Sequence, residues 1–93
     1  PKGTAIVAKL LFVEDDREIA GMVTAWLTQQ RFEVETAYDG DTGLEMLLMN
    51  QYDAIILDWE LPGKSGFELI KIFREKKGLT PIIMLTAKGT VAE

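Results

Sequence analysis

The chain has 93 residues, of which 47% are hydrophobic and 27% are charged, so its composition is that of one small globular domain. It contains no cysteine and no histidine, which excludes disulfides, thiolate or imidazole metal sites, and any mechanism that uses those side chains. The net charge of -5 argues against direct nucleic-acid binding, and no apolar run is long enough to span a membrane, so the expected compartment is the cytoplasm.

The first predicted element is a buried strand over 10–13, a short apolar run that leads directly into three acids. Asp15 and Asp16 stand where the cap of a following helix belongs, and alone they could be no more than that cap. Apolar residues then recur at helical spacing, which predicts a helix with one buried stripe. The stripe consists of Ile19, Met22, Val23, Trp26 and Leu27.

Alternation over 32–38 predicts a half-buried strand, and Asp39-Gly40 is a turn signal. A short helix follows, with Leu44, Leu47 and Leu48 on one side. The next apolar run, 54–57, is a second buried strand that ends at Asp58, and the loop after it contains one proline and two glycines.

The last helix is predicted over 67–77, with Leu69, Ile70 and Phe73 facing inward and Gly78 placed to end it. A fourth strand over 81–85 leads to Thr86. We expect Trp26 and Phe73 in the core, since both lie on apolar stripes, and Trp59 partly exposed beside Asp58.

Alternating strands and helices predict a doubly wound α/β fold, with a parallel sheet covered by helices on both faces. Sites in such folds lie at the carboxyl ends of the strands, where Glu14, Asp15, Asp58 and Thr86 all fall. A carboxylate cluster formed by folding requires either a bound cation or a raised pKa. Without His or Cys, the plausible metals are hard, oxygen-ligated cations such as Mg2+.

The chain resembles the receiver domain of bacterial two-component response regulators, from about Lys9 to its last residue. Receivers carry an acid pair after strand one, a phosphoacceptor Asp after strand three, a Leu-Pro-x-x-x-Gly segment, and Thr or Ser followed by a small residue after strand four. Several motifs in the right order are hard to match by chance. Here they are Glu14 with Asp15, Asp58, the segment 61–66, and Thr86 with Ala87.

The resemblance implies a flavodoxin-like sheet of strand order 2-1-3-4-5 and a phosphoacceptor switch rather than an enzyme. By that resemblance, Asp58 takes a phosphoryl group from a phosphohistidine on a sensor histidine kinase. Mg2+ would be held by Asp15 and Asp58 directly, by Glu14 through a water, and by the backbone carbonyl of Glu60. Thr86 would donate its hydroxyl to the phosphoryl group and act as the switch.

Receiver domains continue through a fourth helix, a fifth strand that bears a Lys, and a fifth helix. Residues 1–93 therefore correspond to the N-terminal four-fifths of one receiver domain, and neither Lys64 nor Lys88 takes the role of that Lys. We expect strand four to be an exposed edge and the stripe of the first helix to lack a neighbour. Self-association of the chain follows from both expectations.

Two other readings stay open at this point. One is a truncated or engineered fragment that folds by association and has lost activity. The other is an Mg2+-dependent aspartyl-phosphate phosphatase, although such enzymes usually carry a second Asp where this chain has Glu60. The acid pair and the run 84–89 most resemble receivers attached to winged-helix DNA-binding domains, which implies a transcription regulator that contacts DNA only through a separate domain.

Overall fold

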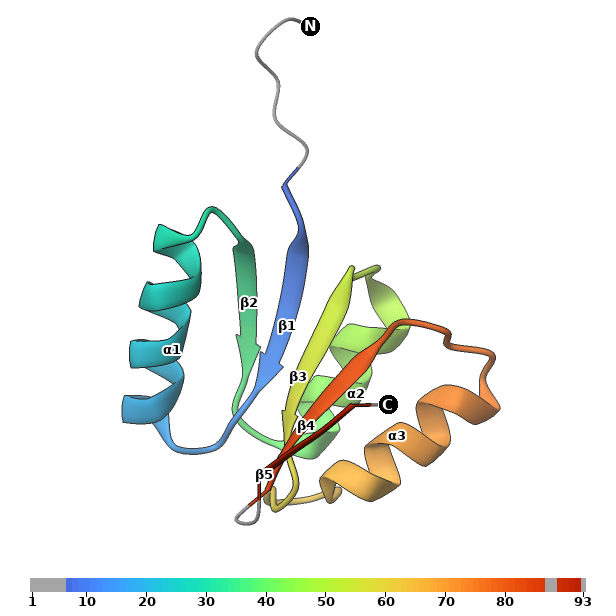
Figure 1. The fold of residues 1–93 in the computed structure, drawn as a ribbon. Coiled ribbons are helices and arrows are strands. Elements are labelled where there is room, and N and C mark those ends of the chain that lie inside the picture. The colour runs from blue at the N-terminus through green and yellow to red at the C-terminus, as the bar shows by residue number, and fades with distance from the viewer. Residues whose placement is uncertain (1–6, 87–88, 93) are drawn as a thin grey trace, which may run out of the picture.

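The computed structural model describes residues 7–86 and 89–92, and the side chains of residues 7–85. A single sheet runs through the middle of the molecule in the order β2-β1-β3-β4-β5 (Figure 1). The first four strands in this order are parallel to one another, and β5 is antiparallel to β4. The strands are β1 (Lys9–Val13), β2 (Glu33–Ala37), β3 (Ala54–Asp58), β4 (Ile82–Thr86) and β5 (Gly89–Ala92).

Three helices cover the described sheet, with α1 on one face and α2 and α3 on the other (Figure 1). Each begins at a residue whose side-chain oxygen accepts a backbone N–H of the first turn, the usual way to satisfy donors that have no partner within the helix. These caps are Asp16 for α1 (Arg17–Gln29), Asp39 for α2 (Gly40–Met49) and Ser65 for α3 (Gly66–Glu75).

The main core lies between the sheet and the pair α2 and α3. Alternate residues of the central strands point into it, as the pleat of a strand requires. These strand residues meet Leu47 of α2 and Leu69 and Phe73 of α3, all of them buried. They are Leu11, Val13, Ile55, Leu57, Ile82 and Met84. The predicted inward face of α3 and the core position of Phe73 are therefore confirmed.

The predicted buried stripe of α1 is only partly correct. Leu27 is buried, but Trp26 is 60% exposed and Met22 is 68% exposed, so the expectation of a core Trp26 is wrong. Ile19 is also exposed. The reason is geometric: α1 packs mainly against β1 and β2, and the apolar stripe is wider than the face that this contact covers.

The edge of the sheet also differs from expectation. Strand β5 pairs with β4 from Ile83 with Ala92 to Thr86 with Gly89, so β4 is not the exposed edge that was predicted. The parallel order β2-β1-β3-β4 of the flavodoxin-like fold is confirmed. No fifth parallel strand occurs among residues 7–86 and 89–92. Within the same ranges, no helix has the length and apolar character needed to cross a membrane.

Candidate functional site

The register of the parallel strands places the acids together at the carboxyl-terminal ends of neighbouring strands. Val13 of β1 lies opposite Leu57 of β3, so the residues that follow them, Glu14 and Asp58, leave the sheet side by side. On the other side of β3, Asp58 pairs with Leu85, and the next residue is Thr86, the last of β4. The chain thus delivers the predicted site residues to the carboxyl ends of three adjacent strands, as parallel α/β sheets do.

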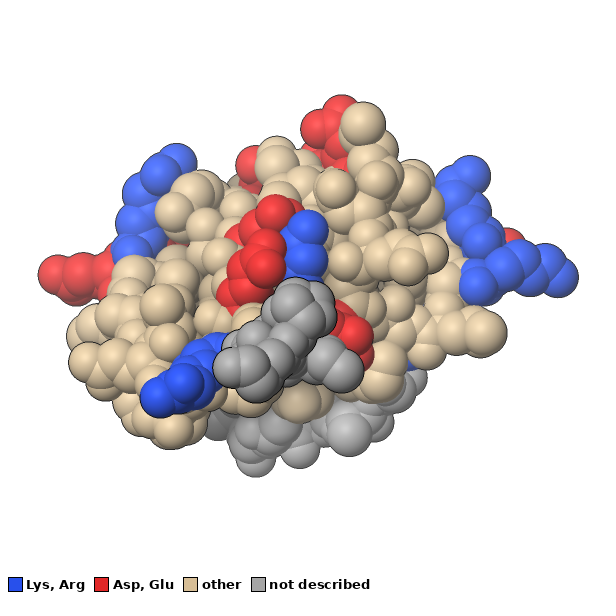
Figure 2. Space-filling view, turned by 90° about the horizontal axis from the view of Figure 1, so that it is seen from above, with Lys and Arg blue, Asp and Glu red and all other residues tan. Residues whose placement is uncertain are grey.

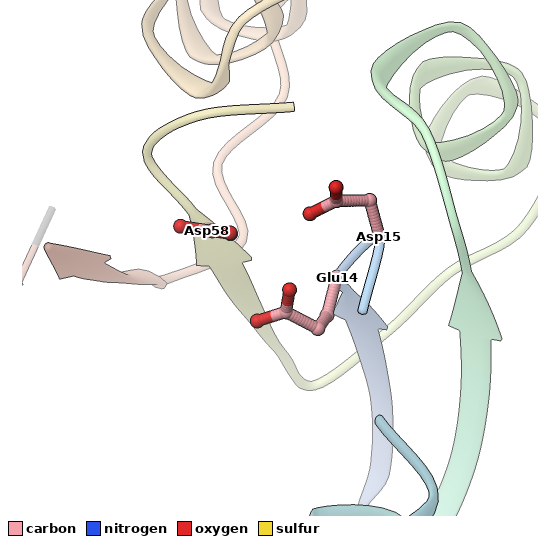
Figure 3. Close-up of side chains that lie close together, drawn as sticks. All are labelled: Glu14, Asp15 and Asp58. Atoms are coloured by element: carbon pink, nitrogen blue, oxygen red, sulfur yellow. The ribbon is translucent and has the colours of Figure 1, made fainter. Parts of the chain in front are cut away.

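Three carboxylates form a cluster at this edge. One oxygen from each of Glu14, Asp15 and Asp58 lies within 4.8 Å of the others, and Figure 3 shows the three side chains converging from the ends of β1 and β3. Glu14 is only 6% exposed, Asp58 is half-buried and Asp15 is exposed. The expected convergence of these acids is therefore confirmed.

Glu14 has the most constrained position of the three. Its backbone N–H donates to the carbonyl oxygen of Ala37 at 2.9 Å, and its Oε2 accepts the backbone N–H of Asp16 at 3.1 Å. Burial raises the pKa of the Glu14 carboxyl, and the neighbouring charges of Asp58 and Asp15 raise it further, against the opposing effect of the Asp16 N–H. A nearby cation would relieve both the burial penalty and the repulsion.

Asp16 has a different task from the two acids before it. Its Oδ1 accepts the backbone N–H groups of Glu18 at 3.0 Å and Ile19 at 3.1 Å, so it is the N-cap of α1. The capping interpretation is thus correct for Asp16, while Asp15 joins the carboxylate cluster. One run of three acids both starts a helix and supplies two groups to the site.

The loop after Asp58 is fixed tightly against the end of β3. The backbone N–H of Gly66 donates to the carbonyl of Trp59 at 3.0 Å, and a Cβ on Gly66 would lie 2.5 Å from the carbonyl oxygen of Asp58. Ser65 and Glu68 form a capping box that starts α3 at this point. The backbone N–H of Glu60 lies 3.4 Å from Oδ1 of Asp58. A side chain at position 66 would push this loop away from the site.

The same loop also rests on the start of α2. The backbone N–H of Gly40 donates to the carbonyl of Pro62 at 3.0 Å, and Nζ of Lys64 pairs with Asp41 at 3.2 Å. A Cβ on Gly40 would collide with the carbonyl oxygen of Lys64. The sequence pattern marks Gly40 only as a turn residue, because its close contact is with Lys64, in a different loop.

The switch hydroxyl of Thr86 cannot be placed at the site. Thr86 ends β4, but its side chain, like residues 87 and 88, lies outside the described part of the chain. The Glu60 carbonyl is close to Asp58 in sequence, and its role as a ligand stays a prediction. Trp59 is 45% exposed, as expected, and its ring packs against the exposed ring of Phe67, with centroids 6.0 Å apart.

The donor set fits a hard divalent cation. Three carboxylates within 4.8 Å supply only oxygen ligands, and Mg2+ is bound in proteins by one or two carboxylates together with retained waters. The buried Glu14 and the exposed Asp15 also leave one side of the cluster open to solvent. The arrangement can therefore hold a cation and admit a phosphoryl group next to Asp58.

Comparison with known proteins gives a consistent picture. Residues 10–93 match the family model described as "Response regulator receiver domain". The chain is 46% identical over 81 residues to the transcriptional regulatory protein DltR of Streptococcus agalactiae. The matched segment covers 87% of this chain and 36% of DltR. The chain therefore spans about a third of the length of such curated relatives.

Solved structures agree with the fold. The receiver domain of the Francisella response regulator 1452 superposes with a TM-score of 0.84 at 34% identity, covering 86% of this chain and 66% of that one. The response regulator TrrA of Thermotoga maritima, in complex with Mg(2+)-BeF, gives a TM-score of 0.82 at 36% identity, covering 87% of this chain and 70% of that one.

Proposed function

The chain belongs to the response regulator receiver family, and from this premise we propose that Asp58 is its phosphoacceptor. Receiver domains act as phosphoacceptor switches that typically bind Mg2+ at an acidic pocket. The observation that carries the proposal is the carboxylate cluster at the ends of β1 and β3, because it joins Asp58 to the two acids that a metal would need. We assign Glu14, Asp15, Asp58 and the backbone carbonyl of Glu60 to the Mg2+ site.

The reaction is transfer of a phosphoryl group from a phosphohistidine on a sensor histidine kinase. A carboxylate oxygen of Asp58 forms the new O–P bond as the N–P bond breaks, and the imidazole nitrogen keeps the bonding pair. A carboxylate needs no general base for this attack, so the absence of histidine in the chain is no obstacle. When bound, Mg2+ supplies positive charge that offsets the charge of the phosphoryl oxygens.

The protein's own contribution is positioning. The β3 register and the backbone contact of Gly66 fix the end of the strand that carries Asp58. The hydrogen bonds of Glu14 hold its carboxylate beside Asp58 without using Asp58 itself. Phosphoryl transfer depends mainly on alignment and charge neutralisation, which are the two things that this arrangement provides.

We further propose that Thr86 reads the modification. It follows the strand residue that pairs with Asp58, so its backbone stands next to the phosphoacceptor at the same sheet edge. A phosphoryl group adds charge and strong acceptor oxygens, and a hydroxyl drawn toward them would shift the end of β4. That shift would be the output of the switch.

The whole protein is proposed to regulate transcription from the cytoplasm. DltR is named as a transcriptional regulatory protein, and this chain covers only its receiver-like part. DNA would be contacted by a separate output domain, in keeping with the net charge of -5 on this chain. The sensor histidine kinase would be the partner at the acidic site, and no membrane contact is needed for that encounter.

Self-association of the 93-residue chain is also proposed. Met22 and Trp26 are 68% and 60% exposed on α1, and large apolar side chains grouped on one face are a common cause of association.

The phosphatase alternative would also use Asp58 as its nucleophile, but Glu60 stands where such enzymes usually carry a second Asp. Steady hydrolysis of a phosphate ester would favour that enzyme over the switch.

The test is the intact mass of the chain after incubation with Mg2+ and acetyl phosphate. We expect one added phosphoryl group in the parent chain and in the control variant Asp53→Asn. In the parent chain the Asp53 carboxylate accepts the backbone N–H of Lys9, at the other end of the sheet from Asp58. Asp58→Asn should gain none. Labelling of Asp58→Asn would contradict the assignment, because another residue would then be the acceptor. No labelling of a parent chain shown to be folded would favour the inactive-fragment reading.

A further inference from the structure

A second concave surface lies at the opposite end of the molecule from the acidic cluster. A groove of about 390 Å3 opens between the C-terminal ends of α2 and α3. Leu47, Tyr52 and Phe73 line it with buried apolar surface. Nothing in the proposed phosphotransfer uses this groove, because the carboxylates of the acidic site lie at the other ends of the strands.

A braced loop forms one wall of the groove. The guanidinium of Arg74 donates from one nitrogen to the carbonyls of Gly78 at 3.0 Å and Thr80 at 2.8 Å. The backbone N–H of Gly78 donates to the carbonyl of Phe73 at 2.9 Å. A Cβ on Gly78 would lie 2.4 Å from the Phe73 ring, so the loop is in direct contact with the core. The loop therefore has a defined shape.

This loop holds a leucine out in water. Leu79 is 89% exposed although the residues on both sides of it are tied to Arg74. At the end of α2, Leu48 is 46% exposed and Met49 is 77% exposed. Apolar side chains that an ordered backbone keeps exposed beside a groove mark a surface suited to docking.

The one charged residue among those that line the groove is a lysine. Lys77 lines it and Lys76 precedes it, both exposed, whereas none of the residues that line the groove is acidic. Figure 2 looks onto this end of the molecule and shows blue side chains gathered over the end of α3, beside a mainly tan surface. The chain as a whole carries a net charge of -5, so this local basic rim is complementary to an acidic partner rather than typical of the surface.

We propose that this groove docks an acidic amphipathic helix of a partner protein. The apolar side of such a helix would cover Leu48 and Leu79, and its carboxylates would meet Lys76 and Lys77. Strand addition is not available here, because β3 and β4 are both paired on each side. A small ligand alone would leave the exposed leucines in water, whereas a helix presents apolar side chains at i, i+3, i+4 and i+7 and can cover both walls.

The test uses the 15N-labelled 93-residue chain and a synthetic amphipathic peptide of about 18 residues with leucines at helical spacing flanked by glutamates. Backbone amide shifts should change around 47–52 and 77–80 and not around Asp58. Leu79→Glu should weaken binding at least about tenfold, as loss of an anchor does. The exposed position of Leu79 makes that variant compatible with folding.

Controls separate this surface from others. Met22→Glu changes an equally exposed apolar residue on α1 and should bind the peptide like the parent chain. The double variant Lys76→Glu/Lys77→Glu should bind the acidic peptide about five-fold more weakly than the parent does at low salt. A second peptide, with lysines in place of the glutamates, should bind no better to the parent than to Leu79→Glu.

Several results would overturn the proposal. These are equal binding to the parent and Leu79→Glu, loss of binding in Met22→Glu instead, or amide shifts confined to α1. Amide shifts at the groove on addition of octanoate, without any on addition of the peptide, would assign the groove to a small amphiphile. None of these results bears on Asp58, whose phosphorylation is tested separately by mass.

Discussion

Removal of one carboxylate from the acidic cluster is expected to stabilise the chain when no metal is present. The carboxylate oxygens of Glu14, Asp15 and Asp58 lie within 4.8 Å of one another. At that separation two unit charges repel by about 0.9 kcal/mol in water and by about 3.5 kcal/mol at an effective dielectric constant of 20. Asp15 is exposed and Asp58 half-buried, so water screens the cluster and the lower value applies. Asp58→Asn removes two of these repulsions and should add about 1 to 2 kcal/mol to the free energy of unfolding.

The assay is urea unfolding of the parent chain and of Asp58→Asn, each with EDTA and with Mg2+. In EDTA the variant should be the more stable. Mg2+ should stabilise the parent, by about 2.7 kcal/mol when its concentration is a hundredfold above Kd, and should have little effect on the variant. Each kcal/mol corresponds to about 4 to 8 °C in Tm for a domain of this size. The parent should therefore be less stable than Asp58→Asn in EDTA and more stable than it in Mg2+.

The matched control is Glu33→Gln, which removes one exposed carboxylate at the start of β2, at the other end of the sheet. Its stability should stay within about 0.5 kcal/mol of the parent in both conditions. An equal gain in Glu33→Gln would mean that net charge and not the cluster is responsible. A variant Asp58→Asn that is no more stable than the parent in EDTA would refute the electrostatic argument.

Three further predictions follow from single residues. Because the folded state raises the pKa of Glu14 above the ordinary 4.5, the stability that this group contributes is present below pH 4.5 and is lost as pH rises through the raised pKa. Without metal, the parent should therefore lose stability relative to Glu14→Gln in urea unfolding as the pH is raised from 4.5, and identical pH profiles would contradict this. Gly66→Ala should destabilise by about 1 to 3 kcal/mol, because its Cβ would meet the Asp58 carbonyl, whereas Gly21→Ala, which meets nothing, should be about 0.5 to 1 kcal/mol more stable than the parent. Trp26→Glu should change stability by less than about 0.5 kcal/mol but reduce self-association in sedimentation, and a parent chain that is already monomeric would contradict the association.

The acidic site was predictable because it depends on local order and on one rule of topology. Apolar runs end directly at Glu14 and Asp58, and parallel strands bring their carboxyl ends to one edge, so the sequence alone places these acids together. The division of labour between Asp15 and Asp16 was not predictable in the same way. Both can cap a helix, and only the backbone geometry selects Asp16 for the cap.

Exposure on α1 was not predictable from periodicity. The spacing of Met22 and Trp26 identifies an apolar face correctly, but it carries no information about what covers that face. In the described structure α1 packs mainly on β1 and β2, so the side of the stripe that reaches beyond these strands remains in water. Antiparallel β5 was missed for a similar reason, since Gly89–Ala92 is too short to show a pattern of its own.

The end of α3 shows how a local rule can give the right turn and the wrong residue. A glycine near the end of a helix usually takes the left-handed conformation, and the sequence places Gly78 to end α3. The residue with positive φ is instead Lys77, at 68°. The absence of a side chain at position 78 serves a different contact, the close approach to the Phe73 ring.

The glycines at both ends of the molecule therefore have a common physical basis. Gly66 lets a loop approach the backbone of Asp58, and Gly78 lets a loop approach Phe73, and each contact is one that a Cβ would prevent. Each close approach sets the position of a neighbouring group, the carboxylate of Asp58 in one case and the exposed Leu79 in the other. Because such contacts depend on how a loop folds back in space, sequence patterns mark the glycine but not its partner. A glycine in a loop beside a charged or exposed group is accordingly a better guide to where a surface is fixed than to where the chain is free to move.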